Sequence, residues 1–313
     1  MGRLITNQRI LFHHPNAQEG AWLRALSEAL PGWELVKWQP GEAAADLAIA
    51  WAPPQQLLDE QPGLKVMFHL GAGVDALWSL RRPPQMQVVR LEDAGMAEQM
   101  VDYALYAVTR HTRDFTNYEQ DWRAGSWTPR RVRPNHEWQI GIMGYGALGA
   151  RVAAVLQSRG YGVHAWSRSP KHGTGVVHHH GMGGLAAFLQ QAHVLIVLLP
   201  LTADTRHLLN ADRLAQLPKG AYFINMARGA LVDTDALAQA LTSGHLAGAV
   251  LDVFEQEPLS PAHPLRQMPN VIGTPHIAAQ TWIPEAVQSI AGNIRAWQDN
   301  HPLHGVVDPL RAY

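Results

Sequence analysis

One glycine pattern limits the fold of this chain more than any other feature of its sequence. Gly144, Gly146 and Gly149 form a GxGxxG motif that directly follows an apolar run and opens a helical stretch. The first glycine permits a tight turn, the second lets a pyrophosphate approach the backbone, and the third lets helix and strand pack closely. The pyrophosphate would lie at the helix N-terminus, where free N–H groups favour an anion. The segment therefore predicts a dinucleotide site in a βαβ unit.

Short apolar runs alternate with helical stretches along the whole chain. The first series of predicted strands is at residues 9–12, 34–38, 45–51 and 65–70. The second series is at residues 139–144, 161–167, 193–199, 221–226, 247–253 and 270–274. Longer helical patterns are at residues 18–30, 94–122 and 284–299. Such alternation predicts right-handed crossovers and mostly parallel sheets, and six strands is the count of a dinucleotide-binding domain.

The two series predict an α/β protein of two domains, each a doubly wound, mostly parallel sheet. The length of 313 residues agrees with this, because single cores stop growing at about 250–300 residues. Residues 1–101 and 284–313 would form a discontinuous, flavodoxin-like substrate-binding domain. Residues 102–283 would form the inserted NAD(P)-binding domain of Rossmann type.

Composition excludes several classes of function. The 25 basic and 26 acidic residues nearly cancel, which argues against nucleic acid as a partner. The longest apolar run, residues 194–199, is far shorter than the about 20 residues that span a bilayer, so we expect a soluble protein without a membrane partner. The absence of cysteine excludes thiolate chemistry and fits a cytoplasmic location. His178–His180 lie in a glycine-rich stretch without further ligand spacing, which predicts a solvated loop and no metal site.

The end of the second strand of the Rossmann series indicates which dinucleotide binds. Arg168 lies 24 positions beyond Gly144, close to the place where an NAD site carries an acidic residue, about 20 residues on. The turn has no carboxylate, and Arg168 could hold a ribose 2′-phosphate, with hydrogen bonds from Ser167 and Ser169 and added charge from Lys171. We therefore expect NADP(H), with NAD(H) as the alternative if the turn contacts nothing.

Three further segments fall at the ends of predicted strands. They are Asn225–Gly229, which contains the motif ARG, Leu251–Leu259, which contains DVFEQEPL, and Thr274–Ala278, which reads TPHIA. In open α/β sheets the carboxyl ends of the strands line one crevice, so these segments could converge. Hydride transfer to a 2-oxo acid needs a cation for the carboxylate, a proton donor and a carboxylate that orients this donor. Arg, His and Glu suit these tasks, although each alone could be a loop anchor, a paired histidine or a surface acid.

These motifs together resemble the D-2-hydroxyacid dehydrogenase superfamily. The sequence GIMGYGALG, the WSRS turn, GAGVD at Gly71–Asp75 and the VDPLRAY end are similar to its glyoxylate/hydroxypyruvate reductase A branch. The resemblance covers nearly the whole chain. It implies an oxidoreductase that reduces glyoxylate to glycolate and hydroxypyruvate to glycerate with NADPH. It also implies a homodimer that forms through the cofactor domain.

The resemblance implies roles for individual residues. The catalytic residues would be Arg228, Glu257 and His276, with His276 as general acid. Trp51 would wall the substrate pocket, and the substrate-binding residues would be Trp51, Gly71, Ala72, Gly73, Val74, Arg228 and His276. The cofactor-binding residues would be Gly144, Tyr145, Gly146, Ala147, Leu148, Gly149, Ser167, Arg168, Ser169, Lys171, Leu199, Pro200, Thr205, Met226, Ala227, Arg228, Asp252, His276 and Ala278.

Two other interpretations keep the same fold. One is an NAD-dependent D-2-hydroxyacid dehydrogenase with a larger substrate, against which the WSRS turn argues. The other is a non-catalytic protein that senses a dinucleotide and binds a partner. The near-zero net charge offers no support for this second interpretation.

Overall fold

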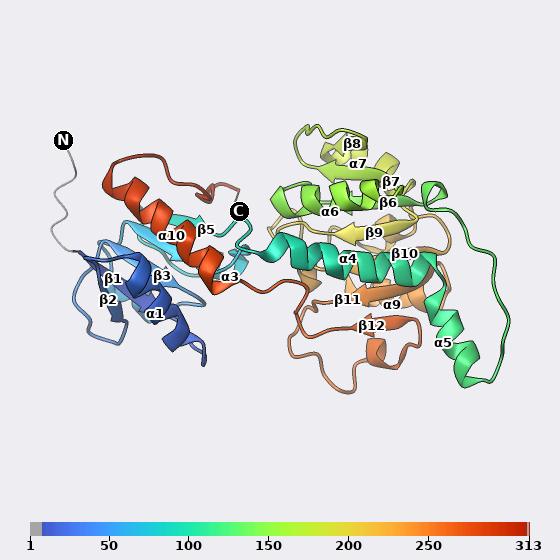
Figure 1. Cartoon of the computed structure of the whole chain (residues 1–313), viewed down its shortest axis with the longest axis horizontal. Helices are drawn as coiled ribbons and strands as arrows, with labels where there is room; N and C mark the ends of the chain where they lie inside the picture. Colours follow the sequence, from blue (N-terminus) through green and yellow to red (C-terminus); the bar gives the residue numbers. More distant parts are fainter. Residues whose placement is uncertain (1–7, 312) are drawn as a thin grey trace. The chain divides into compact units, whose positions relative to one another are not determined.

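The computed structural model describes residues 8–311 and residue 313. These residues form two compact units, shown at the two ends of Figure 1. Unit 1 contains the described residues up to Met96 and those from Thr281 onward, and unit 2 contains Ala97–Gln280. The chain thus leaves unit 1, builds unit 2 and returns to unit 1.

Unit 1 is built on a five-stranded parallel sheet in the order β2-β1-β3-β4-β5, which is the flavodoxin order. Its strands are β1 (Arg9–His13), β2 (Glu34–Lys37), β3 (Leu47–Ala50), β4 (Val66–His69) and β5 (Gln87–Arg90). Its helices are α1 (Glu19–Ala29), α2 (Gln55–Glu60), α3 (Asp75–Trp78) and α10 (Ile283–Gln298). β3 and β4 are buried along their whole length, so apolar residues are required on both faces of the sheet.

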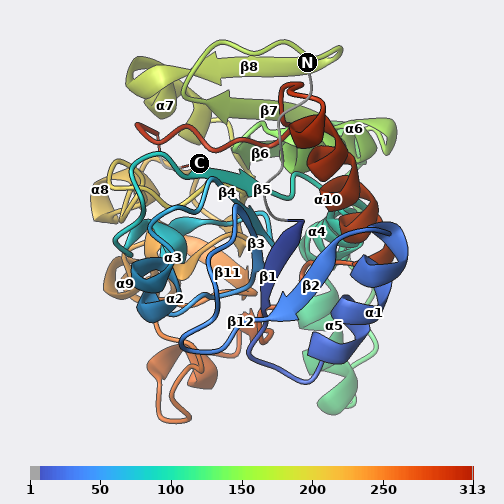
Figure 2. The same ribbon diagram turned by 90° about the vertical axis from the view of Figure 1, so that its left-hand side faces the viewer.

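The helices of unit 1 cover both faces of this sheet. α1 packs against α10, although nearly the whole sequence separates them. In Figure 2, α1 and α10 lie on one side of the strands, and α2 and α3 lie on the other. Leu57 and Leu58 of α2 and Leu77 of α3 join a core that also contains Leu11 and Ala48 of the sheet.

Unit 2 is built on a seven-stranded parallel sheet in the order β12-β11-β10-β9-β6-β7-β8. Its strands are β6 (Gln139–Met143), β7 (Gly162–Ser167), β8 (Val176–His180), β9 (Val194–Val197), β10 (Ala221–Asn225), β11 (Leu246–Leu251) and β12 (Val271–Gly273). Its α-helices are α4 (Met96–Thr112), α5 (Phe115–Arg123), α6 (Ala147–Ser158), α7 (Gly181–Leu189), α8 (Ala211–Leu214) and α9 (Thr234–Thr242). Three short 3-10 turns are η1 (Asn135–Glu137), η2 (Gly229–Leu231) and η3 (Pro264–Gln267). The strand order reverses between β6 and β9, and ligands of such sheets bind at this switch point.

Successive side chains of the central strands point to opposite faces of the sheet of unit 2. Ile140 and Ile142 of β6 face α4 and α6, where Ala104, Val108 and Val152 complete a core. On the other face, the strands pack against α7 and α9 through residues such as Phe188. α4 and α6 lie in front of the sheet in the view of Figure 1.

The predicted fold class of two mostly parallel α/β domains is confirmed. The prediction of one long helix over residues 94–122 is wrong, because the chain forms α4 and α5 with a break between them. Asp114 has a φ of 59°, in the left-handed region, and ends the regular pattern at Arg113. Neither glycine nor proline marks this break, and Asp is one of the few other residues that adopt this conformation readily.

Two edge strands were not predicted from the sequence. β5 lies at one edge of the sheet of unit 1, and β8 at one edge of the sheet of unit 2, which has seven strands where six were expected. β8 contains His178–His180, so the predicted solvated loop is wrong. Only partly buried, the strand lacks the apolar run by which central strands are found.

Within residues 8–311 and 313, no helix combines the length and apolar character needed to cross a membrane. The same residues hold no group of three or more His, Asp or Glu side chains arranged to bind a metal ion.

Candidate active site

The glycine loop after β6 is tight on its inner side and open on its outer side. Gly144 has a φ of 114°, and a Cβ atom there would collide with the backbone of Leu198, after β9. Gly149 packs so closely on the carbonyl group of Gly144 that no side chain fits. In contrast, a Cβ atom built on Gly146 meets no atom of the described residues within 4 Å. The space beside Gly146 suits a pyrophosphate that must approach the backbone.

The N-terminus of α6 provides the anion-binding end of this loop. Ala147 and Leu148 open the helix directly after Gly146, which has no side chain to cap their N–H groups. Free N–H groups and the helix dipole favour a phosphate at this position. The ring of Tyr145 contacts the ring of His178 edge-on, with 4.6 Å between the ring centroids. The loop therefore fits the dinucleotide that its sequence predicts.

The turn after β7 carries the residues predicted to select the dinucleotide. Ser167 is buried, and its hydroxyl donates a hydrogen bond to the carbonyl oxygen of Ser169 at 2.8 Å. Trp166 holds the base of the turn, because its indole N–H donates to the carbonyl oxygen of Gly181 at 2.9 Å. Arg168 and Lys171 are exposed. In this arrangement the Ser167 hydroxyl stabilises the turn, while Arg168 and Lys171 lie at its exposed surface.

A large part of unit 2 has no carboxylate at all. The sequence contains neither Asp nor Glu between Glu137 and Asp204. This stretch forms β6, α6, β7, β8, α7 and β9, and it includes both the glycine loop and the Arg168 turn. No acidic side chain of this stretch can therefore repel the phosphates of a dinucleotide.

The segment after β9 is fixed by a threonine. The Thr205 hydroxyl donates to the carbonyl oxygen of Pro200 at 2.7 Å and accepts the N–H of Thr202 at 2.8 Å. Leu199 is buried at the start of this segment. The predicted cofactor-lining residues Leu199, Pro200 and Thr205 are thus brought together at the carboxyl end of β9.

Arg228 lies in a turn that a buried asparagine organises. Asn225, the last residue of β10, is completely buried. Its side-chain amide group donates to the carbonyl oxygen of Arg228 at 2.9 Å, and its side-chain oxygen accepts the backbone N–H of Ala227 at 3.1 Å. The Arg228 guanidinium donates to the carbonyl oxygen of Ala227 at 2.8 Å. Gly229 packs against the backbone of Phe254 so closely that no Cβ atom fits. The Arg228 turn is therefore fixed against the loop after β11.

Asp252 orders the loop that contains the predicted acid. It follows β11, is 1% exposed, and accepts three hydrogen bonds. The donors are the Thr274 hydroxyl at 2.6 Å and the N–H groups of Ile277 and Ala278, both at 2.8 Å. A buried carboxylate needs such donors to remain charged. Asp252 therefore organises the 274–278 loop, and its predicted contact with the cofactor remains a prediction.

His276 and Glu257 form a hydrogen-bonded pair. Nδ1 of His276 lies 2.9 Å from Oε2 of Glu257, and Oε1 of Glu257 accepts the N–H of Phe254 at 3.0 Å. Both side chains are partly exposed. The backbone N–H of His276 donates to the carbonyl oxygen of Asp252 at 2.9 Å. The φ of His276 is 56°, which turns the backbone sharply. With Nδ1 occupied by Glu257, Nε2 is the ring nitrogen that can transfer a proton to a ligand.

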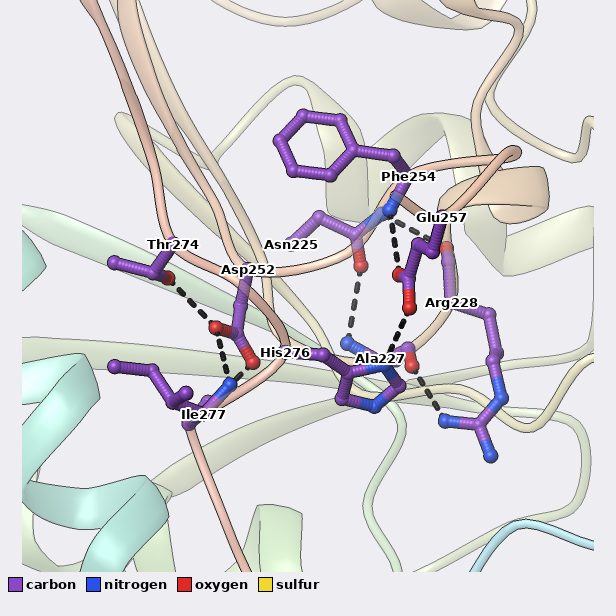
Figure 3. A network of polar contacts seen from close by, with 10 residues as sticks. Asn225, Ala227, Arg228, Asp252, Phe254, Glu257, Thr274, His276 and Ile277 are labelled. Atoms are coloured by element: carbon purple, nitrogen blue, oxygen red, sulfur yellow. Dashed lines mark hydrogen bonds and ion pairs between the residues drawn. The ribbon is translucent and has the colours of Figure 1, made fainter. Parts of the chain in front are cut away.

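Figure 3 shows these residues as one polar network. The segments come from the carboxyl ends of β10, β11 and β12, which are neighbours in the sheet. The His276 ring and the Arg228 side chain extend to the same side of the view. A cation, a proton donor and a carboxylate that orients this donor are thus present on neighbouring strand ends, which is the set needed to reduce a 2-oxo acid.

The predicted substrate residues of unit 1 form a second group. Trp51 is 37% exposed, and its ring lies 5.1 Å from that of His69, measured between centroids. Trp51 covers Gly71, and Nδ1 of His69 lies 3.2 Å from the carbonyl oxygen of Gly71. Ala72 and Gly73 are partly exposed, whereas Val74 is buried. Trp51 and the Gly71–Val74 loop are therefore adjacent within unit 1.

Sequence reasoning gave no role to some residues that support the site. Asn225 was named only as the first residue of its strand-end segment, although a polar residue at a strand end next to a motif is a usable signal. Tyr103 of α4 was missed as well; its hydroxyl lies 2.5 Å from that of Thr274. Burial raises the pKa of Tyr103 to about 12, so its hydroxyl stays protonated and available as a donor. Met226 and Ala278, predicted to bind the cofactor, are buried in the core.

Comparison with known proteins identifies the family. Residues 105–278 match the model of the D-isomer specific 2-hydroxyacid dehydrogenase, NAD binding domain. The glyoxylate/hydroxypyruvate reductase A of Serratia proteamaculans is 45% identical, with 97% of this chain and 99% of that protein covered. The protein of the same name from Citrobacter koseri is 43% identical, with the same shares covered.

Solved structures agree with this assignment. A D-isomer specific 2-hydroxyacid dehydrogenase from Xanthobacter autotrophicus, in complex with NADPH and MES, superimposes with a TM-score of 0.92 at 41% identity. An NADPH-dependent glyoxylate/hydroxypyruvate reductase from Sinorhizobium meliloti, in complex with NADP and sulfate, superimposes with a TM-score of 0.91 at 33% identity. Each comparison covers 97% of this chain and 99% of the other.

Proposed function

Because the chain belongs to the D-isomer specific 2-hydroxyacid dehydrogenase family, we propose that it reduces glyoxylate to glycolate and hydroxypyruvate to glycerate with NADPH. The observation that carries this proposal is the Glu257–His276 pair, which lies at the strand ends that also present Arg228. Unit 2 would hold the cofactor.

His276 would act as the general acid. Glu257 would accept a hydrogen bond from the Nδ1–H group of the ring, so Nε2 would carry the proton that moves to the carbonyl oxygen of the substrate. NADPH, when bound, supplies a hydride to carbon 2 of the substrate. Arg228 would bind the substrate carboxylate through its forked donors and polarise the carbonyl group.

The remaining predicted residues would position the two ligands. The glycine loop and the α6 N-terminus would hold the pyrophosphate, while Arg168 and Lys171 would bind the 2′-phosphate and Ser167 would shape their turn. Trp51 would wall the substrate pocket, and the N–H groups of the Gly71–Val74 loop would bind the substrate carboxylate.

We also propose that the enzyme is a cytoplasmic homodimer that forms through unit 2. The absence of cysteine is consistent with a reducing compartment. Large exposed aromatic side chains on α4, α5 and the segment that follows support an interface there; these are Tyr106, Phe115, Trp122 and Trp127. Exposed apolar surface of this extent marks association sites.

The test is a comparison of initial rates for glyoxylate, hydroxypyruvate and pyruvate, each with NADPH and with NADH. Higher kcat/KM with NADPH and either of the first two substrates would support the proposal. Higher kcat/KM with NADH would overturn the cofactor assignment. Lack of turnover with all three 2-oxo acids, despite tight binding of NADPH, would overturn the substrate assignment.

A further inference from the structure

A second carboxylate in the 252–258 loop has its own set of contacts, and the catalytic roles above do not use it. Glu255 is two residues before Glu257. Its Oε1 accepts a hydrogen bond from the Thr234 hydroxyl at 3.0 Å and lies 3.2 Å from Nε2 of His207. Both partners of Glu255 come from outside the loop: His207 follows the 199–205 segment, and Thr234 is the first residue of α9. Glu255 therefore connects three separate segments of unit 2.

Backbone hydrogen bonds fix the segments that carry His207 and Thr234. The N–H of His207 donates to the carbonyl oxygen of Ala230 at 2.8 Å, and the N–H of Asp233 donates to that of Leu209 at 3.0 Å. Asp233 also caps α9, since its side chain accepts the N–H of Ala236 at 3.0 Å. His207 and Thr234 thus lie in segments that are hydrogen-bonded to each other. The Glu255 side chain attaches the 252–258 loop to these segments.

His207 adopts an unusual backbone conformation at this point. Its φ of 48° lies in the left-handed region, which is uncommon for residues other than glycine, although histidine is enriched among those that adopt it. Such a conformation costs free energy and persists where the surrounding structure fixes it. Here it directs the imidazole toward Glu255 while the backbone stays bonded to Ala230.

Glu257 itself has few restraints. Apart from His276, its carboxylate accepts the N–H of Phe254, a residue of the same loop, so this bond moves with the loop. The close contact between Gly229 and the backbone of Phe254 and Glu255 fixes one side of the loop. The anchors of Glu255 hold the side chain that lies two residues before Glu257.

We propose that Glu255 is a positioning residue for the Glu257–His276 pair, with His207 and Thr234 as its anchors. The proposal rests on the proposed function, in which His276 is the proton donor. Small displacements of a catalytic group matter, because a shift of about 1 Å can cost about 100-fold in rate. His207 also links the loop to the 199–205 segment. The pair that contains the proposed acid, His276, is thereby connected to the predicted cofactor-lining residues.

The main test uses Thr234→Val, which removes one anchor without changing charge or shape. His207→Asn keeps a residue that tolerates a positive φ but shortens the side chain. Glu255→Gln removes the charge, and Glu255→Asp keeps it. We expect kcat to fall by about 10-fold in Thr234→Val and His207→Asn, while the KM for NADPH changes little.

Asp46→Asn is the matched control. Asp46 pairs with Lys65 at 2.9 Å in unit 1, so this variant also loses one partly exposed ion pair. Thermal unfolding is followed for every variant. Glu255→Asp should retain more activity than Glu255→Gln. Variants that unfold at lower temperature but keep the wild-type kcat would overturn the proposal, because the anchors would then be merely structural.

A spectroscopic test separates this proposal from the proposed function. With isotope-labelled histidine, the Nδ1 signal of His276 reports its hydrogen bond to Glu257 whether or not the enzyme turns over. We expect this signal to change in Thr234→Val and to stay unchanged in Asp46→Asn. A wild-type protein that lacks turnover but shows this pattern would overturn the function and leave the positioning role supported. An unchanged signal in Thr234→Val would overturn the positioning role alone.

Discussion

Trp51 occupies the space that a side chain at Gly71 would need. A Cβ atom on residue 71 would lie 2.5 Å from Cζ3 of Trp51. The indole therefore rests directly on the backbone of the Gly71–Val74 loop, with His69 beside it. Since Trp51 is the proposed wall of the substrate pocket, Gly71 determines where this wall stands.

The first prediction follows from this contact. Gly71→Ala should displace the indole and reduce kcat/KM for hydroxypyruvate by up to about 10-fold, with a smaller effect on the more compact glyoxylate. The KM for NADPH should not change. Gly63→Ala is the control, because a Cβ atom there meets no atom of the described chain within 4 Å. Equal losses for the two substrates would contradict a role of Trp51 in selecting them.

The second prediction concerns the proton donor. His276→Asn should lower kcat by about 10²–10⁴-fold, the contribution typical of general acids. Asn is preferred to Ala because the φ of 56° is in the left-handed region, which Asn tolerates. His301→Asn, at an exposed position, serves as the control. Stopped-flow rates of the first turnover measure the effect, and undiminished rates would exclude His276 as the acid.

The third prediction concerns the choice of dinucleotide. Arg168→Gln should raise the KM for NADPH by about 10–100-fold, the loss expected for a hydrogen bond to a charged group. The KM for NADH, which lacks the 2′-phosphate, should stay nearly constant. Arg159→Gln is the control variant, because it removes an exposed positive charge at the C-terminal end of α6, away from the glycine loop. If the KM for NADPH and the KM for NADH rise by the same factor, Arg168 does not contact the 2′-phosphate.

The fourth prediction concerns stability. His111 stacks on Tyr222 at 4.5 Å between centroids and contacts Trp138 edge-on. Burial, with the nearby charges of Arg133 and His193, lowers the pKa of His111 to about 4. The unfolded chain binds this proton at higher pH than the folded chain does. The stability is therefore complete above the unfolded pKa of 6.5 and is lost as the pH falls toward 4.

His111→Phe tests this directly. The Nε2 atom of His111 is buried and has no hydrogen-bond partner among the described residues, so a phenyl ring can replace the imidazole. Between about pH 7 and about pH 5, the wild type should lose about 2 kcal/mol more of its free energy of unfolding than the variant does. Urea denaturation at both pH values measures this difference, and His136→Phe, at an exposed position, is the control. Parallel losses would show that His111 does not titrate as stated.

Much of the fold was predictable because local patterns carry it. The GxGxxG motif and the alternating apolar runs predicted parallel α/β architecture, since both depend on neighbours in the sequence. The break at Asp114 and the strand β8 were missed for the same reason. A single left-handed residue between two helical patterns leaves no local signal, and β8 is recognisable only by its pairing with β7.

The candidate site was predictable in its motifs and less so in its support. The three segments at Arg228, Glu257 and His276 follow adjacent strands, as expected for an open parallel sheet. The roles of Asn225, Tyr103 and Glu255 depend on contacts between segments far apart in the chain. Spacing within one motif cannot reveal these contacts. The roles of the individual catalytic and cofactor residues remain predictions that the variants above address.

The carboxylate-free half of the sheet in unit 2 has a consequence for kinetics. Its exposed charges are cationic, because the interval between Glu137 and Asp204 contains no carboxylate. A surface of one sign attracts a polyanion over distances of about one Debye length, near 10 Å at moderate ionic strength. The dinucleotide would therefore be steered toward its loop before contact, and added salt would slow its association more than its release.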